Sequence, residues 1–313
     1  MKKYKSRRDH NHSRARSFAF IVALILIGLV SVALYTSSQP TTSHLPATLE
    51  FNPQPWMIFV PRQVEYVGYI NYHEAFGVSG NSSLFGSKVL LQLPQVNFTI
   101  YPQNVVYELD IELVPPQFNG TVSVISLTQQ QSQSLSGDLM NVNVTRVHTP
   151  IEYDGYLIYA LLMHKFGLDK LELAYLTVIN GNIVLSYDQA TGLKNVEVIL
   201  DQVSSNSSSL FDDVNVRDAF FLTGSSQNTI GFFVGLFPTQ FAGSSLIAKS
   251  VVYDGSTLLV IRALLFPSSE VAMNNLSEAE QVYSGASCKT VDSWLSITNS
   301  YSISRLPTEL SGI

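Results

Sequence analysis

The chain has only one cysteine, Cys288, among its 313 residues, so it cannot form an internal disulfide bond. Its stability must therefore come from the packing of a core rather than from covalent cross-links. A reactive cysteine needs a neighbouring base and a depressed pKa, whereas an isolated one is usually a small buried residue. We interpret Cys288 as a buried or half-buried residue without a catalytic role.

Charged residues are also scarce, at 13% of the chain, and they are unevenly distributed. Residues 36–313 contain 11 Lys and Arg against 23 Asp and Glu, a formal net charge of −12, while residues 1–35 carry +6. A phosphate backbone is bound by basic stripes, and residues 36–313 contain none. Nucleic acid is therefore not an expected partner.

The familiar catalytic and cofactor motifs are missing as well. The chain contains no G-x-S-x-G elbow, no H-E-x-x-H pair and no glycine-rich phosphate loop. The histidines beyond residue 35 lack the spacing of metal ligands and are interpreted as solvated or hydrogen-bonding residues: His44, His73, His148 and His164. A site formed in three dimensions by His73, His148 and His164 stays open at this point.

Three carboxylates lie close together at Asp212, Asp213 and Asp218, and such a group could hold a hard cation such as calcium. The D-x-[DN]-x-[DN]-G loop is absent, which favours a solvated acidic turn. Lys249 is interpreted as a strand-edge lysine rather than as the base for a serine. We accordingly predict no catalytic, cofactor-binding or metal-binding residue.

The clearest positive signal is a run of eighteen apolar or small residues from Phe18 to Tyr35. At 1.5 Å per residue a helix of this length covers about 27 Å, close to the thickness of the hydrocarbon layer. Seven Lys and Arg precede the run, and no charged residue lies between Thr36 and Leu49. The positive-inside rule then predicts a cytoplasmic tail (1–16), one transmembrane helix in contact with membrane lipid (17–35), and an extracellular remainder.

A cleaved secretory signal is the alternative interpretation of the same segment. Ser31-Val32-Ala33 has the small-x-small pattern of a cleavage site. The apolar run and the basic region are both longer than in a usual signal, which favours a retained anchor in the plasma membrane. Both interpretations export the same C-terminal part.

The exported part divides into a short spacer and a folded region. Residues 36–55 hold four prolines among Ser and Thr, which is typical of an extended stalk. The fold is expected to start near Trp56, giving an extracytoplasmic domain over 56–313. Six Asn-x-Ser/Thr triplets exceed the roughly three expected by chance and are candidates for glycosylation: Asn81, Asn97, Asn119, Asn143, Asn206 and Asn275.

Three hairpins are predicted from turn residues between strand-like runs. The first hairpin has its turn at Asn119-Gly120, between Val105–Val114 and Thr121–Leu127. The second has its turn at Asn180-Gly181, between Leu173–Ile179 and Ile183–Ser186. The third has its turn at Asp254-Gly255, between Leu246–Tyr253 and Thr257–Ile261. A helix is expected after each hairpin, over Thr128–Leu139, Asp188–Leu200 and Ser269–Tyr283, the last capped by Ser268 or Ser269. A strand is expected before each, over Val64–Tyr72, Tyr153–Leu162 and Arg217–Leu222.

This order predicts an α+β fold, mainly an antiparallel sheet built from hairpin-then-helix modules. The modules would span 56–140, 141–202 and 210–285; a chance recurrence of Asn-Gly and Asp-Gly turns is the alternative. Val291–Leu306 would form a final strand segment, with Trp294 and Ile303 on its apolar side. The aromatic runs Phe232–Phe237 and Tyr66–Tyr72 could belong to the core or form a docking face.

The stretch Phe59–Ile70 resembles the opening of exported prokaryotic domains of unknown function, and Tyr175–Val198 is similar to a later part of such domains. The combination of basic tail, anchor, Ser/Thr/Pro stalk and domain rich in Tyr, Val, Asn and Ser resembles surface proteins of thermoacidophilic archaea. The resemblance implies a location and a fold class, but it assigns no activity to any residue.

These observations favour a membrane-anchored cell-surface glycoprotein with a non-catalytic binding, assembly or structural role. It could be an accessory subunit that contacts another envelope or membrane protein. Two alternatives remain open: an exported hydrolase or metal-dependent enzyme whose residues converge in three dimensions, and a solute-binding receptor with a deep cleft lined by tyrosines.

Overall fold

The computed structural model describes residues 51–80, 89–94, 98–114, 120–140, 149–164, 171–205, 207–224, 229–237, 241–311 and 313. These residues belong to one compact unit, Ser43–Ile313. The predicted tail, transmembrane helix and stalk up to Glu50 lie outside the described residues. Within the described ranges, no helix is long and apolar enough to cross a membrane.

The described part contains fourteen strands in one sheet. They are β1 (Val64–Asn71), β2 (Leu91–Leu93), β3 (Phe98–Ile100), β4 (Val105–Leu113), β5 (Gly120–Leu127), β6 (Ile151–Tyr153), β7 (Tyr156–His164), β8 (Leu171–Ile179), β9 (Asn182–Ser186), β10 (Thr229–Gly235), β11 (Leu246–Tyr253), β12 (Leu258–Leu265), β13 (Ser287–Val291) and β14 (Trp294–Tyr301).

The helices include short 3₁₀ turns as well as α-helices. The α-helices are α2 (Tyr72–Ser79), α3 (Gln129–Met140), α4 (Gly192–Ser205), α5 (Val214–Leu222), α6 (Ser269–Asn274), α7 (Leu276–Val282) and α8 (Leu306–Leu310). The 3₁₀ turns are η1 (Pro55–Phe59), η3 (Pro102–Asn104), η4 (Leu210–Asp212) and η5 (Ile303–Arg305).

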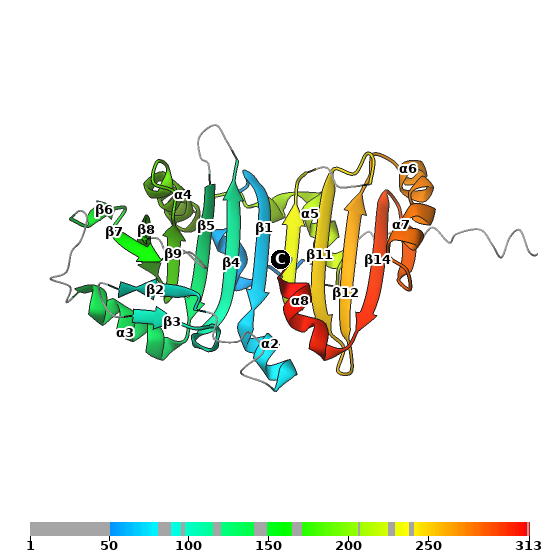
Figure 1. Cartoon of the computed structure of the whole chain (residues 1–313). Coiled ribbons are helices and arrows are strands. Elements are labelled where there is room, and N and C mark those ends of the chain that lie inside the picture. Colours follow the sequence, from blue (N-terminus) through cyan, green and yellow to red (C-terminus); the bar gives the residue numbers. More distant parts are fainter. Residues whose placement is uncertain are drawn as a thin grey trace, which may run out of the picture. The chain divides into compact units, whose positions relative to one another are not determined.

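The sheet runs in the order β13-β14-β12-β11-β10-β1-β4-β5-β9-β8-β7-β2-β3, with β6 paired to β7 (Figure 1). Every neighbouring pair is antiparallel. The predicted α+β class with a mainly antiparallel sheet is therefore confirmed. Strands β1 and β10 are far apart in sequence but adjacent at the middle of the sheet, and the candidate site lies beside them.

The three predicted hairpins are β4-β5, β8-β9 and β11-β12. Asn180 and Gly181 have φ of 48° and 83°, the positive values that a type I′ turn requires. Gly255 has φ of 97°, a left-handed conformation that glycine adopts without strain. Local turn chemistry therefore favours the β8-β9 and β11-β12 hairpins at the predicted turns.

Each hairpin is followed by a helix, α3, α4 or the pair α6 and α7. The Ser268 hydroxyl accepts a hydrogen bond from the Val271 amide and caps α6, as predicted. The single helix expected over Ser269–Tyr283 is divided at Asn275, which ends α6 and precedes α7.

The strand predicted over Arg217–Leu222 is wrong, because these residues form the last six of the nine residues of α5. Its buried residues Val216, Ala219 and Phe220 follow the i, i+3, i+4 spacing of a helix face. The Asp213 carboxylate accepts a hydrogen bond from the Asn215 amide and starts the helix. The strand that precedes the third hairpin is β10 instead.

The C-terminal segment differs from its prediction in part. Trp294 is buried in β14, but Ile303 lies in the 3₁₀ turn η5 and Leu306 begins helix α8. Pro307 favours this helix start, because its fixed φ suits the first turn and its missing N–H is not needed there.

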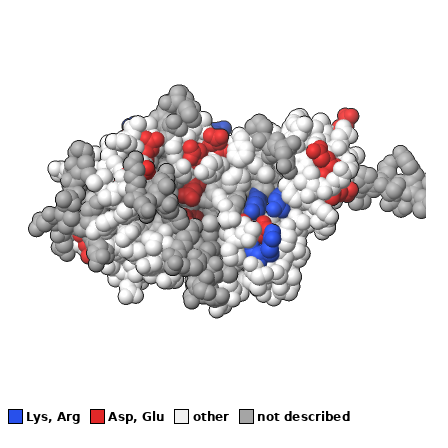
Figure 2. Space-filling model, in the orientation of Figure 1, with Lys and Arg blue, Asp and Glu red and all other residues white. Residues whose placement is uncertain are grey.

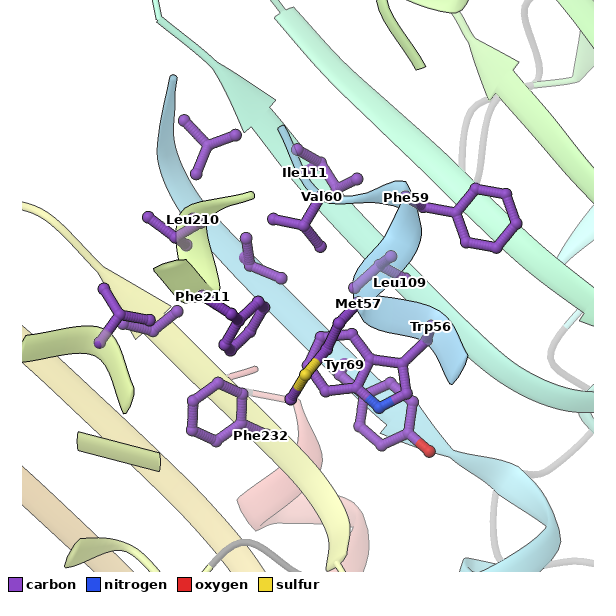
Figure 3. Packing of buried hydrophobic residues seen from close by; sticks show 14 of the residues in the cluster. Trp56, Met57, Phe59, Val60, Tyr69, Leu109, Ile111, Leu210, Phe211 and Phe232 are labelled. Atoms are coloured by element: carbon purple, nitrogen blue, oxygen red, sulfur yellow. The ribbon is translucent and has the colours of Figure 1, made fainter. Parts of the chain in front are cut away.

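The back face of the sheet carries the largest core, formed with η1, α4, η4 and α5. Figure 3 shows its aromatic centre, where Trp56 stacks on Tyr69 at 4.6 Å between ring centroids and meets the edge of Phe211 at 5.3 Å. Phe51 packs against Phe220 at 6.0 Å. Phe51, which the proline pattern assigned to the stalk, is therefore part of the folded domain.

The front face is covered in separate patches. Helix α3 with β2 and β3 covers one end, α2 and α8 lie at the middle, and α6 with α7 covers the other end (Figure 1). Helix α8 fits closely because Gly68 and Gly231 leave room for Leu310 and Ile313. A Cβ at Gly68 would lie 2.6 Å from the Ile313 carbonyl oxygen.

Alanine substitutions at two glycines should have opposite effects on stability. Gly68→Ala is expected to lower the free energy of unfolding by about 1–3 kcal/mol, because the new methyl group meets backbone. Gly137→Ala in helix α3 has no heavy atom within 4 Å of its Cβ and should raise stability by about 0.5–1 kcal/mol. Urea unfolding of the full chain measures both, and a stabilising Gly68→Ala would contradict the packing of Ile313.

The β11-β12 turn predicts a pH dependence. Hydrogen bonds from the Thr257 and Ser256 amides lower the pKa of Asp254 to about 2. Because this pKa is lower in the folded chain than in the unfolded chain, where it is near 4, the ionised carboxylate stabilises the fold at pH values above about 4. This contribution is lost as the pH falls through about 2. In Asp254→Asn, the urea midpoint should therefore fall less steeply from pH 4 to 2 than in the parent; equal slopes would contradict this.

Candidate binding surface

One part of the front face combines half-buried aromatic rings with carboxylates. The strand register places two rows of side chains across β5, β4, β1 and β10. One row runs Thr121, Glu112, Tyr66, Gly235, and the next runs Ser123, Asp110, Gly68, Phe233. We use the name aromatic–acidic strip for seven residues on this face: Tyr66, Asp110, Glu112, Thr121, Ser123, Phe233 and Phe237.

The aromatic half of the strip is a contiguous series of rings. Tyr66 and Phe233 have centroids 5.8 Å apart, and Phe233 and Phe237 are 6.1 Å apart. The Phe237 ring lies over Gly235, where a Cβ would be 2.4 Å from it. All three rings are half-buried, so they present apolar area on a rigid sheet.

The acidic half follows strand β4. The Ser123 hydroxyl donates to an Asp110 carboxylate oxygen at 2.5 Å, and the Thr121 hydroxyl donates to Glu112 at 2.6 Å. The Tyr72 hydroxyl donates to Glu108 in the same row of alternating residues at 2.7 Å. These bonds fix the carboxylates in place on the sheet.

The electrostatic environment of the strip is negative. Burial raises the pKa of Tyr66, and the nearby charges of Glu112, Asp110 and Glu65 raise it further. Burial and these negative charges both disfavour the phenolate anion, while a hydrogen bond with the Thr121 side chain acts in the opposite direction. Figure 2 shows acidic atoms grouped left of centre on this face and a separate basic patch to the right.

The basic patch holds helix α8 on the sheet. Lys249 donates to the Glu309 carbonyl oxygen at 2.6 Å, and the Glu309 carboxylate lies 3.7 Å from Lys249, 3.8 Å from Arg262 and 3.3 Å from Arg305. Strand β11 lies between β10 and β12, so the prediction of Lys249 as a strand-edge residue is wrong. Its amine is half-buried and its pKa is lowered by that burial.

The histidines and aspartates singled out from the sequence have separate positions. His73 is exposed in α2, His164 ends β7, and His148 lies outside the described residues. Asp212 accepts from the Ser209 amide at 2.8 Å and Asp213 caps α5, so both organise the local turn. The described residues contain no group of three or more His, Cys, Asp and Glu side chains that could hold a metal ion.

Of the glycosylation candidates, only Asn275 lies within the described residues. It is half-buried, and its side-chain amide donates to the Val271 carbonyl at 2.9 Å. The other candidates lie outside the described residues: Asn81, Asn97, Asn119, Asn143 and Asn206.

Two open hollows lie away from the strip, near the C-terminal end of α4. One of about 660 Å³ is lined by Arg62, Gln202 and Ser207, and the other of about 680 Å³ by Tyr153 and Ser204. Asp201 lines both and accepts a hydrogen bond from the Tyr153 hydroxyl at 2.8 Å.

The sequence pattern indicates the strip's aromatic residues as a possible docking face but does not single out its acids. The run Phe232–Phe237 divides between the faces: Phe232 and Val234 are buried in the back core, while Phe233 and Phe237 are half-buried on the front. The acids Glu108, Asp110 and Glu112 alternate within a strand that was predicted correctly. That period of two was the signal that could have placed them on one face.

Comparisons with known proteins give little further information. No protein-family model matches the chain, and no curated protein matches it. Solved structures similar to it include crystal form III of TP0453, a spirochete protein, at 9% identity and a TM-score of 0.48, covering 84% of this chain and 99% of that chain. Crystal form I of TP0453 has 9% identity and a TM-score of 0.47, covering 83% and 98%.

Proposed function

We propose that this chain is a membrane-anchored cell-surface protein with a non-catalytic binding role, and that the aromatic–acidic strip is its binding surface. The observation that carries the binding role is the strip itself. It places aromatic rings beside fixed carboxylates on an ordered sheet, and interfaces are enriched in aromatic residues at their centre with polar groups at the rim.

The proposed location comes from the sequence. The seven cationic residues before Phe18–Tyr35 would stay in the cytoplasm, and the domain would stand outside the plasma membrane as in the archaeal surface proteins that the chain resembles. Glycosylation at the Asn-x-Ser/Thr triplets, and a repeated hairpin-then-helix module, belong to the same proposal. The partner would be another envelope or membrane protein.

Labelling of single cysteines tests the topology, and the single native cysteine makes this simple. In a Cys288→Ser background, a membrane-impermeant maleimide should label Ser284→Cys, which is exposed after α7, on intact cells. Ser6→Cys in the basic tail should react only after the cells are permeabilised. The reverse pattern would refute the proposed orientation.

Photo-cross-linking in cells tests the binding role. A photoreactive residue at Thr121, exposed on the strip, should form a discrete adduct of higher mass. The matched control is the same residue at Val282, which is 50% exposed in α7 and distant in the sheet order from the strip. Equal yields at both positions, or no adduct at Thr121, would remove support for the strip as the binding surface.

A further inference from the structure

We propose that the two open hollows near the C-terminal end of α4 bind an acidic sugar, with the carboxylate of a uronic acid held by Arg62. The site is separate from the aromatic–acidic strip, so this inference goes beyond the proposed function and does not depend on it. It follows from the shape of the hollows, the hydrogen-bonding groups on their walls and the position of Arg62.

The hollows have the size of ligand sites and share one lining residue. Their volumes of about 660 and 680 Å³ lie within the roughly 300–1,000 Å³ that ligand pockets occupy. Asp201 lines both hollows, so a ligand of linked units can extend from the Arg62 side to the Tyr153 side. A chain of sugar rings matches this open, extended shape.

The walls of the first hollow are held in place by contacts between segments. Pro61 forms an antiparallel backbone bridge with Ser209, which joins the segment before β1 to the segment after α4. The Gln202 side-chain amide donates to the Ser207 carbonyl at 3.0 Å, and the Ser207 hydroxyl donates back to Gln202 at 2.5 Å. Because these groups are already ordered, a ligand loses less affinity to the cost of ordering them.

The walls offer hydrogen-bond donors and acceptors side by side. Gln63 and Ser208 are exposed, and each side chain can both donate and accept. One carboxylate oxygen of Asp201 accepts from Tyr153, and the other has no hydrogen bond to any residue in the described ranges. A sugar hydroxyl also donates and accepts, so a polyhydroxyl ligand can satisfy this mixture of groups.

Tyr153 adds an aromatic ring to the second hollow. Its ring is half-buried, and the hydrogen bond to Asp201 at 2.8 Å fixes its direction. It also lies at the end of the β6-β7 hairpin, whose turn residues Asp154 and Gly155 have φ of 48° and 79°, the positive values of a type I′ turn. The C–H face of a sugar ring can pack on such a fixed aromatic face.

Arg62 determines which sugar fits best. It is exposed, it is the only cation among the described residues that line the two hollows, and no ion pair joins it to another residue in the described ranges. A guanidinium group binds a carboxylate through two parallel hydrogen bonds. The other charged lining residues are Asp154 and Asp201, and the C-terminal end of α4 carries partial negative charge, so a doubly charged phosphate is disfavoured. A sugar with one carboxylate and several hydroxyls is therefore the complementary ligand.

A matched pair of probes tests this specificity. Methyl β-glucuronide and methyl β-glucoside differ only where a carboxylate replaces a hydroxymethyl group. Their binding can be measured by saturation-transfer NMR with the full chain, produced without N-glycosylation and kept in a detergent that has no sugar headgroup. The glucuronide should bind saturably and at least about fivefold more tightly than the glucoside. Absent binding, equal affinities, or displacement of the glucuronide by an equal concentration of inorganic phosphate would overturn the proposal.

Charge variants assign the carboxylate to Arg62. Arg62→Gln should weaken glucuronide binding by about tenfold and change glucoside binding by less than about twofold. Lys289→Gln removes the same charge from an exposed position in the edge strand β13, and it should bind both probes as the parent does. Equal losses of glucuronide affinity in the two variants would show non-specific attraction and overturn the role of Arg62.

A filled hollow provides the second test of position. Gln63→Trp places a large side chain at the first hollow from an exposed position and should weaken binding of the glucuronide by more than about tenfold. Gln281→Trp makes the same change at an exposed position in α7 and should leave binding unchanged. Parent-like affinity in Gln63→Trp would show that the sugar binds elsewhere and overturn the proposal.

Discussion

Replacing Trp56 with alanine is expected to lower the free energy of unfolding by about 3–5 kcal/mol, one of the largest losses available to a single substitution in this chain. The side chain is only 3% exposed, in the short turn η1 that leads into β1. It stacks on Tyr69 and meets the edge of Phe211, so truncation removes apolar burial and two aromatic contacts and leaves a cavity.

The neighbouring residue provides the control. Ile58 lies in the same turn but is 48% exposed, so Ile58→Ala should change stability by no more than about 0.5 kcal/mol. Thermal unfolding of the full chain, followed by circular dichroism, should show a fall in Tm of roughly 10 °C for Trp56→Ala. If Trp56→Ala lowered the Tm by no more than Ile58→Ala does, the Trp56 side chain would not be packed in the core on the back face.

The sequence predicted the parts of this fold that depend on neighbouring residues. The Asn180-Gly181 and Asp254-Gly255 turns specify hairpins through residues that accept positive φ or cap their own turn. Part of helix α5 was misassigned because Phe220 and Phe221 favour strands, while its buried residues follow helical spacing. There, packing on the back core outweighed local propensity.

The candidate site could be predicted only in part. Alternation in strand β4 places its acids on one face, but the sequence did not reveal that β1 and β10 lie beside them. The contact between Lys249 and Glu309 joins residues 60 positions apart and depends on where α8 docks. Such long-range pairs have no local signal, so the basic patch was not predicted and Lys249 was misplaced.

Glu309→Gln is expected to lower the free energy of unfolding by about 2–4 kcal/mol, because it leaves cations without their counter-charge in a mostly buried position. The Glu309 side chain is 8% exposed, and those of Lys249 and Arg262 are 13% and 15% exposed. Once the carboxylate is neutral, these two cations repel one another and the ion pairs that hold α8 are lost.

A surface ion pair is the control for this prediction. Lys194 and Glu197 are closer, at 2.7 Å, but Lys194 is 61% exposed, so water screens the pair and Glu197→Gln should cost no more than about 1 kcal/mol. Burial, rather than distance, decides which pair matters more. A larger effect in Glu197→Gln than in Glu309→Gln, measured by urea unfolding, would contradict this ranking.

The pH dependence of Glu309→Gln gives a second readout. Burial lowers the pKa of Lys249 while Glu309 opposes the shift, so removing that charge should lower the pKa further. When the pKa of a lysine is lower in the folded chain than in the unfolded chain, the folded chain binds fewer protons, and the charged lysine lowers the free energy of unfolding. This loss disappears as the pH rises toward the ordinary lysine pKa near 10.5. The stability deficit of Glu309→Gln should therefore shrink between pH 7 and 10, whereas a deficit caused only by altered packing would stay constant.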